Sequence, residues 1–242
     1  MIESAALAAI AFLGALIFGT TGFGAALVTM PLATHLVSLQ FALALFVLVD
    51  LAAALMVGLE NPKNAVRSEW TRLVPMIIVG TALGVTLLVN LPRAAGMLLL
   101  GAFVLGFAVY TLLPHRGHRV VDSRWGWVAG LAGGITSTLF GAGGPPYAIY
   151  LSQRGLTKEQ FRATLGLATL TSISLRLVAF LITGVLLDPA VWMKAAFAVP
   201  ACLFGIWIAR RIFRRISREL LMRAVSVLLL FSGASLISRA LL

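Results

Sequence analysis

Two glycine-rich breaks interrupt apolar stretches at matching places in the two halves of the sequence. The first break reads Gly19-Thr20-Thr21-Gly22-Phe23-Gly24, and the second contains Thr138, Gly141, Gly143, Gly144, Pro145 and Tyr147. Gly22 and Gly24 precede Gly141 and Gly143 by 119 positions. Backbone that leaves helical geometry at membrane depth is tolerated only where it is buried in protein or lines a cavity. Paired breaks of this kind are typical of the binding site of a secondary transporter.

The composition is that of a polytopic membrane protein. Hydrophobic residues make up 60% of the chain and charged residues 11%, whereas about 25% of a typical soluble domain is charged. We interpret the net charge of +11 as a basic excess in cytoplasmic loops and expect no nucleic-acid partner. No Cys/His cluster has the spacing of a metal site and no nucleophile lies near a base. We therefore expect no metal, no cofactor and no enzymatic activity.

Hydrophobic periods and breaks predict five elements in each half. In the first half they cover 4–19, 24–37, 40–59, 71–90 and 94–113. In the second half they cover 124–139, 144–153, 160–184, 189–209 and 217–240. The last three elements of each half have about the 20 residues needed to cross a bilayer, whereas those beside each break have only about 10 to 16. The sequence predicts an all-α protein in which each half is a re-entrant helical hairpin followed by three transmembrane helices.

The basic residues predict an orientation and an inverted repeat. Four segments contain 15 of the 19 Lys and Arg residues, and we place them in the cytoplasm: 61–72, 114–124, 153–162 and 210–223. A hairpin plus three spans is an odd number of crossings. The N-terminal repeat (1–114) and the C-terminal repeat (124–242), joined by a cytoplasmic linker (115–123), should therefore be inverted, with both termini extracytoplasmic.

Weak internal similarity supports a duplication beyond the two breaks. Gln40-Phe41 matches Gln160-Phe161, and Pro75 with Gly80 matches Pro200 with Gly205. The offset between the two copies drifts from 119 to 125 positions along the chain. This drift requires small insertions in the second copy.

The breaks could bind an anion through backbone amides. A helix that starts inside the membrane presents unpaired N–H groups and the positive end of its dipole. We expect donors at Gly22, Phe23, Gly24 and Ala25 and at Gly143, Gly144, Tyr147 and Ala148. Hydroxyls of Thr20, Thr21 and Thr138 would assist, whereas Pro145 lacks an N–H and should stiffen the second break. The alternative is close helix packing, which is our interpretation of Gly14, Gly130, Gly134 and Gly166.

Two ionisable residues fall within predicted spans. Asp50 lies in the middle of 40–59 and Arg176 well inside 160–184. A charge at a helix centre costs about 2.5–3.5 kcal/mol on insertion scales, so such residues are functional candidates. Arg176 could contact the anion through its planar fork of donors, and Asp50 could carry a coupling proton. Alternatively, the two form a pair that only holds helices together.

The motif Phe18-Gly19-x-x-Gly22-Phe23-Gly24 followed by Pro31-Leu32, loosely repeated as Gly134-x-x-Ser137-x-x-Phe140-Gly141-x-Gly143-Gly144-Pro145-Pro146, resembles the sulfite exporter TauE/SafE family of membrane permeases. The resemblance extends over essentially the whole chain. It implies movement of small sulfur-containing anions, such as sulfite, thiosulfate or organosulfonates, across the bacterial inner membrane. Only the two glycine-rich breaks correspond to the family motif.

These observations together predict a secondary transporter that holds its anion between the two breaks near the membrane midplane. Access would alternate as one repeat moves against the other, coupled to protons or driven by the anion gradient and the membrane potential. An anion channel with the same site and a non-transporting membrane subunit remain alternatives. The substrate, the direction of transport and the oligomeric state, whether monomer or homodimer, stay open.

Overall fold

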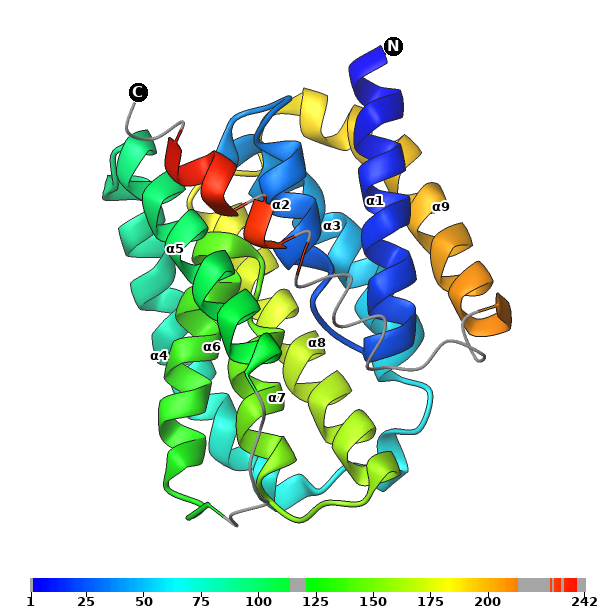
Figure 1. Cartoon of the computed structure of the whole chain (residues 1–242), viewed down its shortest axis with the longest axis vertical. Coiled ribbons are helices and arrows are strands. Elements are labelled where there is room, and N and C mark those ends of the chain that lie inside the picture. The colour runs from blue at the N-terminus through cyan, green and yellow to red at the C-terminus, as the bar shows by residue number, and fades with distance from the viewer. Residues whose placement is uncertain (1, 114–120, 213–226, 228, 232, 239–242) are drawn as a thin grey trace.

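The structure is a computed structural model that describes residues 2–113, 121–212, 227, 229–231 and 233–238 (Figure 1). The first half forms α1 (Ile2–Thr21), α2 (Ala25–Ala33), α3 (Leu39–Gly58), α4 (Arg67–Asn90) and α5 (Arg93–Leu112), with a short 3-10 helix η1 (Pro62–Asn64). The second half forms α6 (Trp125–Phe140), α7 (Gly144–Ser152), α8 (Lys158–Ile182) and α9 (Pro189–Ile212). The described part of the chain contains no strand.

Among the described residues, six helices are long and apolar enough to cross a membrane, which confirms the predicted all-α membrane class. They are α1, α3, α4, α5, α8 and α9. The helices α2, α6 and α7 are shorter, with 9, 16 and 9 residues. The predicted last span, 217–240, lies largely outside the described residues, and the same holds for most of the linker 115–123.

The first helix is longer than its predicted range of 4–19. It has 20 residues, enough to span, so the prediction of a short arm before the first break is wrong in length. The hydroxyls of Thr20 and Thr21 donate to the carbonyl of Ile17 one turn back, at 2.8 Å each. These residues therefore continue the helix until Gly22, whose φ of +80° ends it. In contrast, α2 stops at Ala33 instead of 37, where the Thr34 hydroxyl donates to Pro31 O at 2.8 Å.

The starts of α3 and α8 are fixed by equivalent caps. The Ser38 hydroxyl accepts a hydrogen bond from the amide of Phe41, and the Thr157 hydroxyl accepts one from the amide of Gln160. Thr157 also forms a full capping box, because the Gln160 side chain accepts from its amide. Ser38 and Thr157 are 119 positions apart, the same offset as the two glycine-rich breaks.

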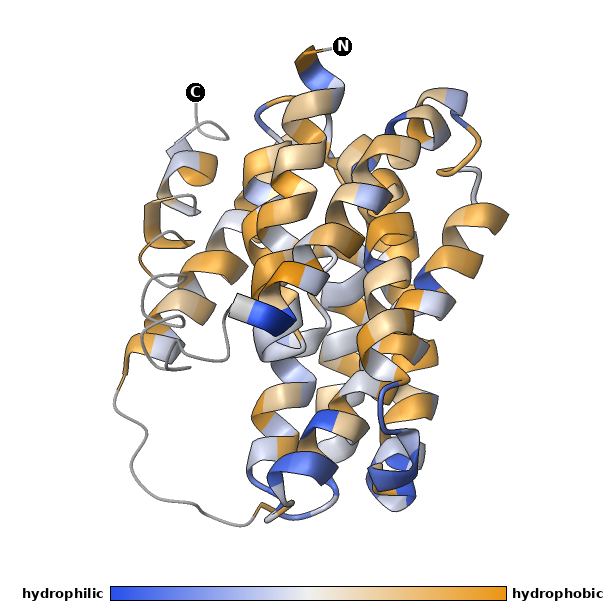
Figure 2. Cartoon of the chain, turned by 90° about the vertical axis from the view of Figure 1, so that its right-hand side faces the viewer, coloured by the Kyte–Doolittle hydropathy of each residue, from blue (hydrophilic) through white to orange (hydrophobic). Residues whose placement is uncertain are grey.

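The two short hairpins open toward opposite ends of the helical bundle. In Figure 1, α1 runs down from the N-terminus and α2 turns back up, whereas α6 rises from the lower end and α7 turns back down. Hydrophilic residues gather at the lower end in Figure 2, while the middle of the molecule is mostly hydrophobic. We call this lower end, formed by residues 59–66, 121–124 and 153–158, the basic end. The other end, which includes residues 34–38 and 183–188, is the opposite end.

Each hairpin packs mainly against a helix from the other half of the sequence. Helix α1 lies along α9, and α6 lies along α4. A Cβ on Gly80 of α4 would lie 2.4 Å from the carbonyl oxygen of Leu131 in α6. A Cβ on Gly205 of α9 would lie 2.8 Å from the carbonyl oxygen of Phe12 in α1. The two contacts are related by the predicted offsets, because Leu131 follows Phe12 by 119 positions and Gly205 follows Gly80 by 125.

The glycines that we interpreted as packing residues have that role. A Cβ on Gly130 would lie 2.6 Å from the Leu73 carbonyl oxygen, and one on Gly134 would lie 2.6 Å from that of Ile77. Gly166 of α8 faces Gly58 of α3, and a Cβ on Gly166 would lie 3.0 Å from the Cα of Gly58. At Gly14 the neighbour is the Thr29 methyl group, at 2.3 Å. This prediction is confirmed, since any side chain at these positions would separate the helices.

Candidate functional site

The two glycine-rich breaks lie against each other in the centre of the molecule. We call residues 22–24 the first tip and residues 141–143 the second tip. A Cβ on Gly144 would lie 2.6 Å from the Cβ of Phe23. A Cβ on Gly141 would lie 3.1 Å from the Cβ of Ala26. Segments 119 positions apart in the sequence are thus in direct contact, as the sequence predicted.

The two tips share a left-handed turn at Gly22 and Gly141, but they differ two residues later, where Gly24 is left-handed and its equivalent Gly143 has a φ of −75°. Gly22, Gly24 and Gly141 have φ values of +80°, +87° and +72°, which other residues adopt only with strain. The amide of Gly22 donates to Phe18 O at 2.7 Å, and the amide of Gly141 donates to Ser137 O at 2.9 Å. These two hydrogen bonds are also related by the offset of 119.

The amide donors at the tips differ from those we expected. The amide of Gly22 is used within its own tip, and the amide of Phe23 donates to the Thr21 hydroxyl at 3.3 Å. These two are therefore not available to an anion. The amides of Gly24 and Gly143 make no hydrogen bond with any described residue. They remain as donors, one on each tip.

A small cavity of about 20 Å³ lies between the tips. It is lined by both tips and by α3 and α8. Its predicted lining residues are Phe23, Gly24, Ala25, Asp50, Gly141, Gly143, Gly144 and Tyr147; the others are Phe18, Ala26, Ser137, Ala142, Thr169, Ser172 and Ile173. Such a volume holds about one water molecule, so a multi-atom anion fits only if the tips separate.

Arg176 does not line the central cavity, but it pairs with Asp50, which does. The Arg176 side chain is fully buried, and its Nη2 lies 2.7 Å from Oδ2 of Asp50. Its Nη1 donates to Ser137 O at 2.8 Å, which ties α8 to the last turn of α6, just before the second tip. A Cβ on Gly141 would lie 3.0 Å from Nη1, so the guanidinium is directly behind the second tip. The predicted pairing of Asp50 and Arg176 is therefore present.

Two buried polar atoms at the site have no hydrogen-bond partner among the described residues. They are Nε of Arg176 and Oγ1 of Thr169, which lines the central cavity. Beside them, the Tyr147 hydroxyl contacts the Ser172 hydroxyl at 3.1 Å. An unpaired buried donor costs about 1–3 kcal/mol, so the Thr169 hydroxyl at the cavity is a candidate partner for a ligand, although Thr29 and Thr81 carry similar hydroxyls outside the cavity.

Several predicted site residues lie elsewhere and have structural roles. Gly19 packs against α9, where its Cβ would lie 2.8 Å from that of Ala209. The Thr138 hydroxyl donates to Gly134 O at 2.9 Å, and the Thr20 hydroxyl donates to its own helix. Pro145 is buried in the first turn of α7 and does not line the cavity. We expected these four residues to contact the anion, and the structure places them away from the central cavity.

The sequence reasoning missed polar residues of α8 that reach the cavity. Thr169 and Ser172 line it, and both lie on the same helical face as Arg176. The spacing of three and then four residues is the signal that could have found them, because residues i, i+3 and i+7 share one face of a helix. A polar stripe that leads to an intramembrane arginine is the pattern to search for.

Two larger pockets approach the tips from the two ends. The basic-end pocket, of about 280 Å³, reaches Thr21 and Gly22 beside the first tip. The opposite-end pocket, of about 390 Å³, reaches Leu139 and Phe140 beside the second tip. Thr21 and Gly22 thus belong to the basic-end pocket and not to the central cavity. The central cavity lies between two wider spaces, one at each end.

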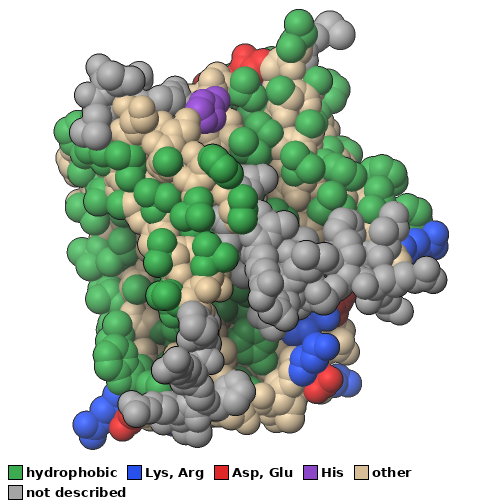
Figure 3. All heavy atoms as spheres, viewed as in Figure 1, with side chains coloured by type: hydrophobic (Ala, Val, Ile, Leu, Met, Phe, Trp, Pro, Cys, Tyr) green, Lys and Arg blue, Asp and Glu red, His purple; other side chains and the backbone are tan. Residues whose placement is uncertain are grey.

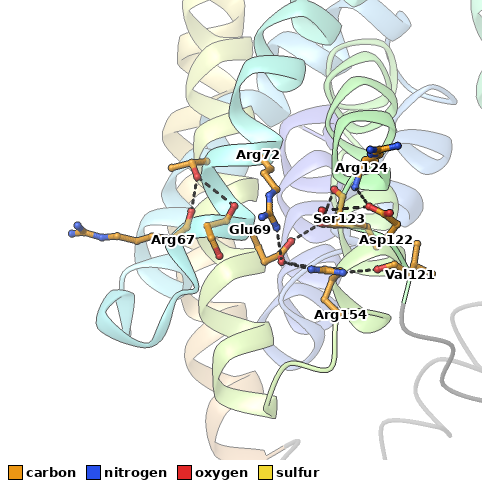
Figure 4. Close-up of polar contacts among 11 residues, drawn as sticks. Arg67, Glu69, Arg72, Val121, Asp122, Ser123, Arg124 and Arg154 are labelled. Carbon is orange, nitrogen blue, oxygen red and sulfur yellow. Dashed lines mark hydrogen bonds and ion pairs between the residues drawn. The ribbon is translucent and has the colours of Figure 1, made fainter.

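A polar cluster around Glu69 holds the basic end together (Figure 4). The Arg154 guanidinium donates to Glu69 through Nε at 3.1 Å and through Nη2 at 2.9 Å, and Arg72 donates to the same carboxylate at 3.1 Å. The hydrogen bond with Glu69 raises the pKa of Arg154. Arg154 also donates to the Val121 carbonyl, and Tyr150 donates to Glu69. The cluster thereby joins α4, the end of α7 and the segment before α6.

Comparison with known proteins agrees with these features. The sequence profile of the family described as "Sulfite exporter TauE/SafE" matches residues 7–236. One similar protein is the "Probable sulfite/organosulfonate exporter TauE" of Cupriavidus necator, 28% identical over 232 residues, which cover 91% of this chain and 88% of that protein. Another is the "Probable inner membrane transporter protein TsaS" of Comamonas testosteroni, 24% identical over 196 residues, which cover 79% and 81%. No solved structure matches the chain significantly.

The profile match covers nearly the whole chain and includes both tips as well as Asp50 and Arg176. It confirms the resemblance that the glycine motifs indicated. Members of this family are transporters and not enzymes, as we expected for this sequence. The chain belongs to the sulfite exporter TauE/SafE family of membrane transporters.

Proposed function

We propose that this protein is a secondary transporter that moves a small sulfur-containing anion, such as sulfite, thiosulfate or an organosulfonate, across the bacterial inner membrane. The anion binds between the two tips, where the central cavity lies. The relative named for sulfite and organosulfonate supports the substrate class, and the relative named as an inner membrane transporter supports the location. The basic end faces the cytoplasm in this proposal, following the positive-inside rule.

The observation that carries the proposal is the convergence of unused donors on one central cavity. The amides of Gly24 and Gly143 approach it from opposite hairpins. Oγ1 of Thr169 lines it, and Nε of Arg176 lies behind its wall, both without a partner in the described chain. A sulfur oxyanion accepts hydrogen bonds through several oxygens and carries the charge that these donors favour.

We infer that Asp50 and the anion compete for Arg176. In the present arrangement, Asp50 neutralises the buried guanidinium at 2.7 Å. Protonation of Asp50 would weaken that ion pair and release Nη2 for the anion. A proton and an anion would then bind together, which is how Asp50 couples transport to protons. A buried charge without a partner is strongly unfavourable, so an empty site with a protonated Asp50 is disfavoured.

The small volume of the central cavity favours a carrier over a channel. The space of about 20 Å³ between the tips is too small for a multi-atom anion to pass without a movement of the tips. The tips must part toward one end at a time, as alternating access requires. The contact of α1 with α9 corresponds to that of α6 with α4, with offsets of 119 and 125 positions, and this correspondence supports two inverted repeats, 1–114 and 124–242. Because each hairpin packs on the other repeat, we expect the moving unit to contain helices from both.

The test is flux through the purified protein in liposomes. Sulfite, thiosulfate, sulfoacetate, taurine, sulfate and chloride should first be compared by thermal shift, and the stabilising anions then used as labelled substrates. Saturable flux that depends on a proton gradient supports a proton-coupled carrier. Ohmic single-channel currents would instead establish the channel alternative. No flux with any of these anions would favour the non-transporting subunit.

A further inference from the structure

We propose that the basic-end pocket is a second anion site, which binds the organosulfonate or sulfite before it reaches the tips. Lys158 and Arg162 are its cationic side chains, and Asn61 and Asn64 supply amide groups. The inference rests on the proposed function for the identity of the anion. It adds a binding site that the glycine motifs do not indicate.

The pocket has the size and position of a loading site. Its volume of about 280 Å³ is enough for a small organic anion together with water. Its inner wall is formed by Thr21 and Gly22 next to the first tip, and its outer rim by the loop after α3 and the start of α8. An anion held there is therefore adjacent to the central cavity.

The charges around the pocket leave its cations available. Glu60 pairs closely with Arg210, at 2.6 Å, and only loosely with Arg162, at 3.9 Å. Arg210 does not line the pocket, so it neutralises Glu60 from outside. Lys158 has no ion-pair partner among the described residues, although Glu159 also lines the pocket. An incoming sulfonate can replace the long contact of Arg162 with Glu60 at small cost, because that contact is half exposed.

The opposite-end pocket is a matched comparison without these charges. It is lined by Leu39 and Gln40 at the start of α3, and no Lys, Arg, Asp or Glu among the described residues lines it. The equivalent caps at Ser38 and Thr157 give an offset of 119 at this point, in place of the 120 indicated by Gln40-Phe41 and Gln160-Phe161, so Leu39 and Gln40 are the equivalents of Lys158 and Glu159. Figure 3 shows a mostly hydrophobic face whose visible Lys and Arg side chains lie at the lower left and on the right side from mid-height down. The cationic side chains therefore belong to the basic-end pocket alone and are not part of the structure that the two halves of the chain have in common.

A general basic excess at this end does not explain the arrangement. Basic loops follow from the orientation rule wherever they point. Arg67, for example, points away from the neighbouring polar cluster in Figure 4 and lines neither of the two larger pockets. Lys158 and Arg162 instead share one cavity with the first tip. The proposal is about this shared cavity, and it predicts an effect that other basic residues lack.

The experiment uses charged thiol reagents as probes of the pocket. Cys202, the single native cysteine, is replaced by alanine, and Asn64→Cys places one thiol, the pocket thiol, in the pocket wall. The probes are 2-sulfonatoethyl methanethiosulfonate, itself an organosulfonate, and the cationic 2-(trimethylammonium)ethyl methanethiosulfonate. The ratio of their reaction rates reports the local potential. Sulfoacetate is added as a competing anion, and Ser68→Cys supplies a control thiol at the same end.

With the double variant Lys158→Gln/Arg162→Gln, we expect the anionic-to-cationic rate ratio at the pocket thiol to fall about 5-fold at 0.1 M salt. The matched change Arg67→Gln/Arg124→Gln should alter it less than about 2-fold. Sulfoacetate should slow the sulfonate reagent at the pocket thiol in the parent, but not in the double variant and not at the control thiol. Equal effects of both double variants, or no protection by sulfoacetate, would overturn the second site.

These readouts do not depend on transport. If the pocket thiol is protected while tip variants leave flux unchanged, the proposed central site fails and the pocket stands. If flux depends on the tips while sulfoacetate does not protect the pocket thiol, the second site fails and the central site stands. The pocket does not set the direction of net movement, because a binding site changes rates and affinities whereas the gradients set the direction.

Discussion

The two tips share the left-handed turn at Gly22 and Gly141 but are held in place by different contacts. The first tip has no charged partner among the described residues: the Thr21 hydroxyl bonds to it within the same turn, and Phe23 packs on Gly144 of the other hairpin. The second tip is held by a distant charge, because Arg176 donates to Ser137 O and pairs with Asp50 across α3 and α8. The two tips thus occupy equivalent places in the fold, but within the described part of the chain only the second tip lies against a charged side chain.

This difference suggests separate roles for the tips. A tip held by short-range contacts can move without breaking an ion pair, whereas a tip tied to Arg176 responds to whatever binds that cation. We infer that the second tip senses the anion and the first tip closes over it. The predictions below test this contrast, from the largest expected effect to the smallest.

Breaking the ion pair should have the largest effect. Arg176→Gln or Asp50→Asn leaves a buried charge without its partner and should cost about 3–5 kcal/mol of stability. The double variant Asp50→Asn/Arg176→Gln should recover much of this loss, because two neutral amides can bond to each other. Thermal unfolding in detergent measures both effects.

The same variants separate a binding role from a structural one. In Asp50→Asn, an anion should raise the melting temperature more than in the parent, because it replaces the missing carboxylate. The double variant should be stable but should not respond to sulfite or sulfoacetate. If it still transports at the parental rate, the pair only holds helices together.

Separating the tips by steric overlap should come next. Gly144→Ala would place a Cβ 2.6 Å from the Cβ of Phe23, which we expect to cost about 1–3 kcal/mol and to lower flux at least tenfold. Gly22→Ala is the matched control, because φ of +80° makes it strained by about 1–2 kcal/mol while no atom lies within 4 Å of its Cβ. Equal flux in the two variants would show that contact between the tips is unimportant.

Removing the orphaned hydroxyl should weaken binding without harming the fold. Thr169→Val keeps the shape of the side chain and deletes a donor at the central cavity, so the half-saturating anion concentration should rise about tenfold. Thr81→Val is the control, since Oγ1 of Thr81 is also buried and unpartnered among the described residues but lies outside the cavity. A similar change in both variants would remove Thr169 from the site.

The local support of the first tip should matter least. Thr21→Val removes the hydroxyl that accepts from the Phe23 amide and should cost about 1 kcal/mol. The half-saturating concentration should stay within about twofold of the parent, because this hydroxyl faces its own turn. A tenfold rise in that concentration would place Thr21 in the anion site and remove the contrast between the tips.

Much of the fold could be predicted because it depends on local patterns. The long apolar runs gave the spanning helices, and the breaks at Gly22 and Gly141 gave the turns, since a positive φ needs glycine. The predicted length of α1 was wrong because the hydroxyls of Thr20 and Thr21 could either bind a ligand or donate to a carbonyl of their own helix. The sequence does not distinguish these two possibilities. The convergence of the tips followed from the repeat itself.

The membership of the site was less predictable, because it depends on which face each helix presents. Gly19 and Thr138 carry the same motif as the lining glycines but face α9 and α4. Thr169 and Ser172 carry no motif but face the cavity. Spacing along a helix gives relative orientation and does not say which neighbour a face meets.

The sequence by itself determined the membrane class, the paired glycine turns and the two intramembrane charges, because each follows from local composition and backbone chemistry. Only the tertiary structure decided that Arg176 meets both Asp50 and the second tip, and that the cations of α8 share a pocket with the first tip. The ion pair and the pocket join residues more than a hundred positions apart. They depend on how each hairpin packs against a helix of the other half.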